Sequence, residues 1–179
     1  MESIGFKEWA LVCDALGRGE QSLILRKGGI AEGRDGFAFR HSEFFLFPTF
    51  FHAQLGLVRG GPELPHVEPG RTEIRFFAKV EEARMICDLE KALRLEPLHV
   101  LSASVVKERF EYDNAPGIHV AFVRVFRLRP TWDFIDEARY GGCRSWVNLR
   151  QPMPDFALEP VLDDAEHARR CEMFRAVGG

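Results

Sequence analysis

Residues 23–54 read LILRKGGIAEGRDGFAFRHSEFFLFPTFFHAQ, and this stretch decides the fold because two apolar segments flank a glycine-rich turn. Residues 23–25 predict a β-strand, residues 28–36 a turn, and residues 41–47 a second strand rich in phenylalanine. Polar groups in such an apolar wall are costly unless they are paired, solvated in a cleft or bound to a ligand. The stretch therefore predicts a cleft that uses its polar side chains. These are Arg26, Lys27, Arg40, His41, Glu43 and His52.

The second strand carries apolar residues on both of its faces. Period-two alternation places His41 and Glu43 on the same face as Phe45, and Phe44 on the opposite face. Aromatic residues on both faces predict a central, buried strand. His41 and Glu43 are then neighbours that can transfer protons, or that can satisfy each other within a hydrogen-bonded cluster.

The glycine-rich segment after Lys27 is expected to be a turn. It lacks the Gly-Lys-Ser/Thr ending of a P-loop, and no amphipathic helix follows it, so Lys27 retains only a weaker phosphate-binding interpretation. Pro48 is expected to end the following strand, and Thr49 to cap a short helix with His52 in its first turn. His41, Glu43 and His52 could together bind a divalent metal, although their spacing matches no named metal motif.

A second expected central strand covers residues 118–128, where Arg124 interrupts one apolar face. A buried arginine needs a carboxylate partner, for which Glu43 and Glu73 are candidates, or a ligand anion. Arg124 is therefore the binding candidate outside the opening stretch.

The remaining segments alternate between short strands, short helices and loops. Residues 6–16 could form a strand or a short helix, and the Gly-Arg-Gly turn that follows favours a strand. We also expect strands at residues 74–80 and 144–149, the first of which extends toward residue 89 after a bulge. Short helices are expected at 89–95 and through 104–110, the latter capped by Ser102 or Ser104, and Thr131 is expected to cap another over 132–138. Residues 151–160 read as a proline-rich linker and residues 163–179 as a helix, on which His167 and Cys171 either share a ligand or form a packed cysteine beside a surface histidine.

The bulk composition is that of a globular protein with no strong overall field. The chain has 179 residues, a net charge of −3 and 28% charged residues, so nucleic-acid binding requires a local basic patch. Four widely spaced cysteines predict reduced thiols in a cytoplasmic protein, and neither a signal peptide nor a membrane span is evident. We expect one α+β domain over residues 1–154 and a helical extension packed on it over residues 155–179.

Three segments carry a resemblance to a known family. KEWALVCDALGRGEQSLILRKGGI (residues 7–30), HSEFFLFPTFFHAQ (41–54) and RFEYDNAPGIHVAFVRVFRL (109–128) resemble the bacterial family called domain of unknown function 1802. The resemblance covers most of residues 6–150 and leaves the helix after about residue 155 outside. That family has no assigned activity, so the resemblance implies no catalytic residues.

The expected architecture is α+β: a mixed, mainly antiparallel sheet or small open barrel with short connecting helices and a C-terminal helix. Its plan is similar to that of the pseudouridine-synthase-associated (PUA-like) domains that bind nucleic acid. The leading hypothesis is a nucleic-acid or nucleotide/anion-binding module, with RNA or DNA as partner, in which aromatics such as Phe50 or Trp146 stack on bases. The phosphates or other anions would lie in a cleft formed by Arg26, Lys27, Arg40, His41, Glu43, His52 and Arg124.

Two alternatives stay open. The first is a metal-dependent phosphodiester hydrolase in which His41 and His52 bind a divalent metal and Glu43 is a ligand or general base. The second is a structural or partner protein of a nucleic-acid-processing system, which would use the proline-rich loop of residues 60–70 and the C-terminal helix.

Overall fold

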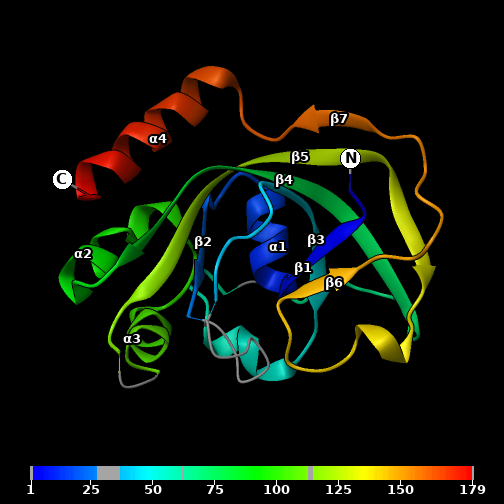
Figure 1. The fold of residues 1–179 in the computed structure, drawn as a ribbon, viewed down its shortest axis with the longest axis horizontal. Coiled ribbons are helices and arrows are strands. Elements are labelled where there is room, and N and C mark those ends of the chain that lie inside the picture. Colours follow the sequence, from blue (N-terminus) through cyan, green and yellow to red (C-terminus); the bar gives the residue numbers. More distant parts are fainter. Residues whose placement is uncertain (1, 28–36, 62, 113–114, 179) are drawn as a thin grey trace.

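The computed structural model describes residues 2–27, 37–61, 63–112 and 115–178, with the side chain of His52 left out (Figure 1). The glycine-rich turn expected at residues 28–36 lies outside the described residues. The strands are β1 (Ile4–Trp9), β2 (Leu23–Arg26), β3 (Glu43–Thr49), β4 (Arg71–Ile86), β5 (Ile118–Ile135), β6 (Trp146–Asn148) and β7 (Ala157–Pro160). The α-helices are α1 (Ala10–Gly17), α2 (Leu89–Arg94), α3 (Ala103–Glu111) and α4 (Asp164–Gly178), and the 3₁₀ helices are η2 (His52–Gly56), η3 (Glu96–Leu98) and η4 (Ala138–Tyr140).

One curved sheet contains all of these strands. Its order is β2-β5-β4-β3-β1-β6, with β7 added on β5, and only the β1–β3 pair is parallel. The path is open, because β2 and β6 each have one strand neighbour among the described residues. The prediction of an α+β fold with a mixed, mainly antiparallel open sheet, short helices and a C-terminal helix is confirmed.

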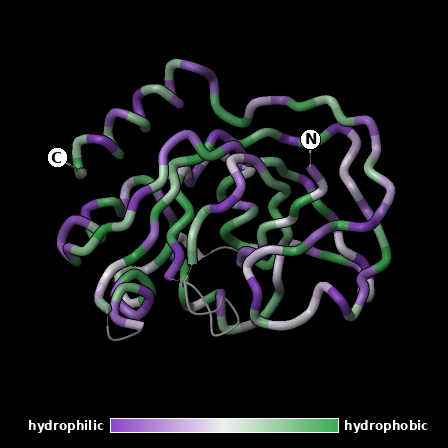
Figure 2. Tube along the Cα trace, viewed as in Figure 1, coloured by the Kyte–Doolittle hydropathy of each residue, from purple (hydrophilic) through white to green (hydrophobic). Residues whose placement is uncertain are grey.

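Strand β3 is central, as its aromatic residues predicted. It lies between β4 and β1, and its side chains alternate between two separate apolar clusters. Phe44 belongs to the larger cluster around α1, whereas Phe45 belongs to the cluster that contains Trp132. Apolar residues accordingly concentrate in the central strands, while the outer helices mix polar and apolar residues (Figure 2).

Residues 10–17 form a helix, so the expectation of a single strand over residues 6–16 is wrong in its second half. Strand β1 ends at Trp9 and α1 follows at once. Seven of the eight residues of α1 are buried, since the helix lies inside the curve of the sheet (Figure 1). A helix that is buried on all sides has no polar face, so its sequence lacks the periodicity that distinguishes a helix from a strand.

The helix expected after Thr131 is also absent. Strand β5 continues to Ile135 and pairs with the first residues of β4. Trp132 and Phe134 are buried, whereas Asp133 and Ile135 are exposed, which is the alternation of a half-buried strand. A threonine followed by acidic residues is also the pattern of a capped helix start, which is why the sequence predicted a helix here.

Two further boundaries differ from expectation. Pro48 lies inside β3 and does not end it, because the Pro48–Thr49 segment still pairs with the parallel strand β1. The expected linker at residues 151–160 contains β7, whose residues pair with β5 from Phe126 to Arg129. Strand β4 does extend past a register shift near Val80, as expected, and reaches Ile86.

Helix α4 packs its apolar residues into the larger core cluster. Cys171 and Phe174 are buried there, and the guanidinium of Arg84 lies 3.9 Å from the centre of the Phe174 ring. His167 is buried too, with its Nε2 2.9 Å from a carboxylate oxygen of Glu81, so the expectation of a surface histidine is wrong. No described helix is both long enough and apolar enough to cross a membrane.

Candidate anion-binding cavity

The curvature of the sheet brings its two edges together. The side chain of Arg26, at the end of β2, donates from Nε and Nη2 to Ser145 Oγ just before β6, at 3.2 and 3.1 Å. Beside this contact lies a cavity of about 450 Å³. Five segments that are distant in the sequence form its wall: the end of β1, the end of β2, the end of β3, the last turn of α3 and the loop before β6. The lining residues are Lys7, Trp9, Arg26, Lys27, Thr49, Glu108, Arg109, Tyr112, Gly142, Cys143 and Arg144.

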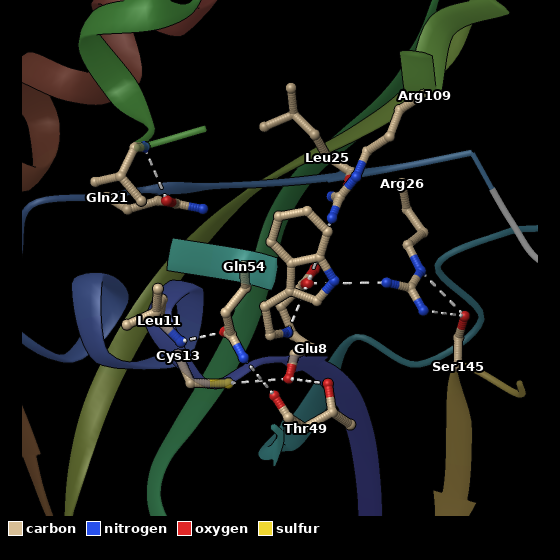
Figure 3. Close-up of polar contacts among 12 residues, drawn as sticks. Glu8, Leu11, Cys13, Gln21, Leu25, Arg26, Thr49, Gln54, Arg109 and Ser145 are labelled. Carbon is tan, nitrogen blue, oxygen red and sulfur yellow. Dashed lines mark hydrogen bonds and ion pairs between the residues drawn. The ribbon is translucent and has the colours of Figure 1, made fainter. Parts of the chain in front are cut away.

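A buried carboxylate holds two of the cavity's arginines. Glu8 is 1% exposed, and its Oε1 lies 3.8 Å from Arg26 Nη1 and 3.8 Å from Arg109 Nη2 (Figure 3). The same oxygen accepts a hydrogen bond of 2.8 Å from the backbone N–H of Trp9. Burial lowers the pKa of Arg109 and the nearby Glu8 raises it. The carboxylate thus stabilises two guanidinium groups that would otherwise repel each other in a poorly solvated place.

The side chain of Arg109 is also held by a backbone carbonyl and by an aromatic ring. Its Nη1 donates to the carbonyl oxygen of Leu25 at 2.5 Å, and its guanidinium lies 4.5 Å from the centre of the Trp9 ring. These contacts join α3 to β2 and β1. The guanidinium is therefore held in place without a ligand.

Lys7 provides the most enclosed ammonium group of the cavity. It is 8% exposed, and its Nζ donates to the carbonyl oxygens of Tyr140 at 2.6 Å and Gly142 at 2.8 Å. Burial lowers the pKa of Lys7, and the positive charge of Arg144 lowers it further. Two neutral carbonyls orient the ammonium without neutralising it, which leaves its charge available to an anion.

The outer part of the cavity carries charge and one exposed ring. Lys27 Nζ donates to the carbonyl oxygens of Ala115 and, at 2.9 Å, Gly117. Tyr112, directly after α3, is 56% exposed and available for stacking. Cys143 and Arg144 are exposed at the opposite side.

Positive charge exceeds negative charge in this cavity. Five cationic side chains line it, against one lining carboxylate and the buried carboxylate beneath, an excess of three positive charges when all are ionised. The cations are Lys7, Arg26, Lys27, Arg109 and Arg144, and the carboxylates are Glu108 and Glu8. An anion is the complementary ligand.

The structure brings only part of the predicted set into this cavity. Arg26 and Lys27 line it. Arg40 is exposed before β3, and His41 lies with Nδ1 3.6 Å from Glu2 and its ring 4.9 Å from that of Trp146.

The other two described candidates lie on other surfaces. Glu43 lies 3.7 Å from Lys79 on the neighbouring strand. Arg124 pairs with Asp164 at the start of α4 and not with Glu43 or Glu73. Among the base-stacking candidates, Phe50 is 44% exposed and does not line the cavity. The centre of the Trp146 ring lies 4.8 Å from that of the Phe6 ring.

The metal hypothesis stays a prediction. The parts of the chain that the structure describes hold no group of three or more His, Cys, Asp or Glu residues arranged around a common metal position. The side chain of His52, on which the proposed set with His41 and Glu43 depends, lies outside the described part of the structure.

Sequence reasoning missed several lining residues. Lys7 and Trp9, with the buried Glu8 between them in sequence, fall within the strand expected over residues 6–16, and Arg109 falls within a short expected helix. Arg144 carried no signal at all. A charged Lys-Glu pair inside an otherwise apolar segment was the one available clue, because a buried ion in a strand requires a partner.

The open mixed sheet with its enclosed helix defines a PUA-like fold. Two crystal structures of variants of the ASCH protein from Zymomonas mobilis share it. One has a TM-score of 0.52 at 13% identity, and the other 0.51 at 14%; each match covers 84% of this chain and 92% of that chain. Identity this low shows a common fold.

The chain belongs to the family described as domain of unknown function (DUF1802), whose model matches residues 5–173. The match includes β7 and most of α4, so the expectation that the family resemblance ends near residue 150 is wrong. No curated protein matches the sequence.

Proposed function

We propose that this protein is a nucleic-acid-binding module whose cation-lined cavity binds a phosphate group. The observation that carries the proposal is the convergence of five lysine and arginine side chains, from four distant segments, on one open cavity. Phosphates are the anionic groups that every nucleic acid presents, and arginine contacts them with paired N–H donors. The PUA-like fold is consistent with RNA binding.

The cavity is organised for an anion before one arrives. Arg26 is held by Ser145, Arg109 by Leu25 and Glu8, and Lys7 by two carbonyls. Binding therefore costs little side-chain entropy compared with binding by flexible surface lysines. Tyr112 at the rim adds a surface on which a base can stack.

Salt-dependent binding to labelled single-stranded RNA and DNA tests the proposal. We expect fluorescence anisotropy to show binding at low salt that weakens steeply as salt increases, because phosphate contacts release counterions. Arg26→Ala should weaken binding about tenfold, since a charge-assisted contact contributes about 1.5 kcal/mol or more.

The matched control is Arg94→Ala, which removes the same charge from an exposed position on α2, outside the cavity. Its affinity should equal that of the unmodified protein. Thermal unfolding of Arg26→Ala separates loss of a contact from loss of fold, and Tyr112→Ala provides a second cavity variant at an exposed position. Absence of binding to every oligonucleotide at low salt would overturn the proposal.

A further inference from the structure

A second cationic hollow adjoins the cavity. It has a volume of about 370 Å³ and lies along β6, the edge strand of the sheet, and η4. We call it the β6 hollow. Its lining residues are Arg139, Tyr140, Arg144, Trp146, Val147, Asn148 and Arg150. Arg144 lines both depressions, so the two meet at one side chain.

Two arginines of the β6 hollow have no carboxylate partner among the described residues. Within the described ranges, neither Arg144 nor Arg150 forms an ion pair, whereas Arg139 pairs with Glu137 at 2.6 Å. Most of the other exposed arginines that the structure describes form ion pairs, as Arg129 does with Glu159 and Arg175 with Glu82. Two arginines without a carboxylate partner among the described residues therefore lie along this edge of the sheet, Arg144 where the cavity and the hollow meet and Arg150 in the hollow.

We infer that the ligand is a single-stranded polynucleotide that runs from the cavity across Arg144 into the β6 hollow. This inference rests on the proposed function and adds the class of nucleic acid and its path. A row of cationic depressions matches the repeated phosphates of a strand, whereas a mononucleotide would occupy only one of them.

The depth of the cavity favours a single strand over a duplex. Lys7 is 8% exposed and the side chain of Arg109 14%, so a ligand reaches their charges by entering the cavity, which residues of α3 and of the loop before β6 line. A single strand can turn one nucleotide into this space. A duplex would first have to unpair and unstack that nucleotide, at a cost of a few kcal/mol.

The length of the bound strand provides the test. Binding is measured for a nucleoside 5′-monophosphate, a dinucleotide, and strands of about four and eight nucleotides, in RNA and in DNA, with an eight-base-pair duplex for comparison. We expect affinity to increase beyond the dinucleotide, and the duplex to bind more weakly than either of its strands.

Arg150→Ala separates the β6 hollow from the cavity. We expect it to weaken binding of the longest strand about fivefold and to reduce the slope of log K against log[salt] by about 0.7, the value for one lost contact to a single strand. Binding of the monophosphate should not change. Arg94→Ala again removes an equal charge at a distance and should change neither quantity.

The possible outcomes distinguish the inference from the proposed function. If affinity stops increasing at the dinucleotide, if Arg150→Ala changes nothing while Arg26→Ala weakens binding, or if the duplex binds as tightly as its strands, the strand path is wrong and the anion cavity stands. If neither variant weakens binding of any nucleic acid, both are wrong.

Discussion

Three consecutive residues of β1, Lys7, Glu8 and Trp9, determine how the cavity is built. All three are at least half-buried, and they contact β2, α3 and the loop before β6. A lysine and a glutamate that are adjacent in sequence use different partners: the lysine two carbonyls, the glutamate two guanidiniums. Except for Arg26, those partners lie about a hundred or more residues away along the chain. The local sequence pattern therefore could not predict the arrangement.

His99 gives the protein a pH-dependent stability. It is 3% exposed, and neither ring nitrogen has a hydrogen-bond partner among the described residues. Burial, aided by the charges of Arg59 and Arg109, lowers the pKa of His99 to about 4, against 6.5 for an exposed histidine. Between these values the unfolded chain binds the proton more readily than the folded chain does, so stability falls as the pH decreases from 6.5 to 4.

The expected loss of unfolding free energy over that range is about 3 kcal/mol, at 1.36 kcal/mol for each unit of pKa. Urea denaturation between pH 4 and pH 8 measures it. His99→Leu places a side chain that cannot be protonated at this position. It should remove this part of the pH dependence of the unfolding free energy and leave the part due to carboxylates. An unchanged slope in the variant would show that His99 does not titrate as described.

At the scale of elements, α1 shows why local pattern misled. Apart from Asp14, its residues are apolar and buried, because the helix packs against β1, β3, β4 and β5. For strand β3, burial on both faces made the prediction correct. Its two faces contact two different apolar clusters, and phenylalanine on both faces is typical of a central strand.

Gly17, the last residue of α1, lies against Phe76 of β4. A Cβ there would lie 1.9 Å from Cζ of Phe76, a ring that is itself 3% exposed. Gly17→Ala should therefore force the ring or the helix to move and lower the unfolding free energy by about 1–3 kcal/mol. Urea denaturation measures the change.

Gly56 provides the matched control for this substitution. A Cβ on Gly56 meets nothing within 4 Å, so Gly56→Ala should leave stability unchanged or slightly higher. Equal losses in the two variants would mean that the contact with Phe76 is not what makes glycine necessary at position 17.

At the scale of the whole molecule, the C-terminal segment shares its core with the sheet. Phe174 is fully buried, with its ring 5.8 Å from that of Phe122 on β5. Phe174→Ala should cost about 3–5 kcal/mol of unfolding free energy, as removal of a buried phenylalanine does elsewhere. Chemical denaturation followed by tryptophan fluorescence measures the loss.

The neighbouring Arg175→Ala provides the control, because that side chain is 65% exposed and forms one surface ion pair with Glu82. It should cost less than about 1 kcal/mol. The division into a domain over residues 1–154 and an extension over 155–179 remains a prediction. A Phe174→Ala loss as small as that of the control would support an extension that the domain does not need.

The sequence by itself determined the α+β class, the mainly antiparallel sheet, the central position of β3 and the family, because these depend on hydrophobic alternation and on motifs within a few dozen residues. It also identified Arg26 and Lys27 as binding candidates, and the structure places both in the cavity. Only the tertiary structure decided which other cations join them. The approach of the two sheet edges to each other and the packing of α3 place Lys7, Arg109 and Arg144 there, since these charges are close in space and distant in the sequence.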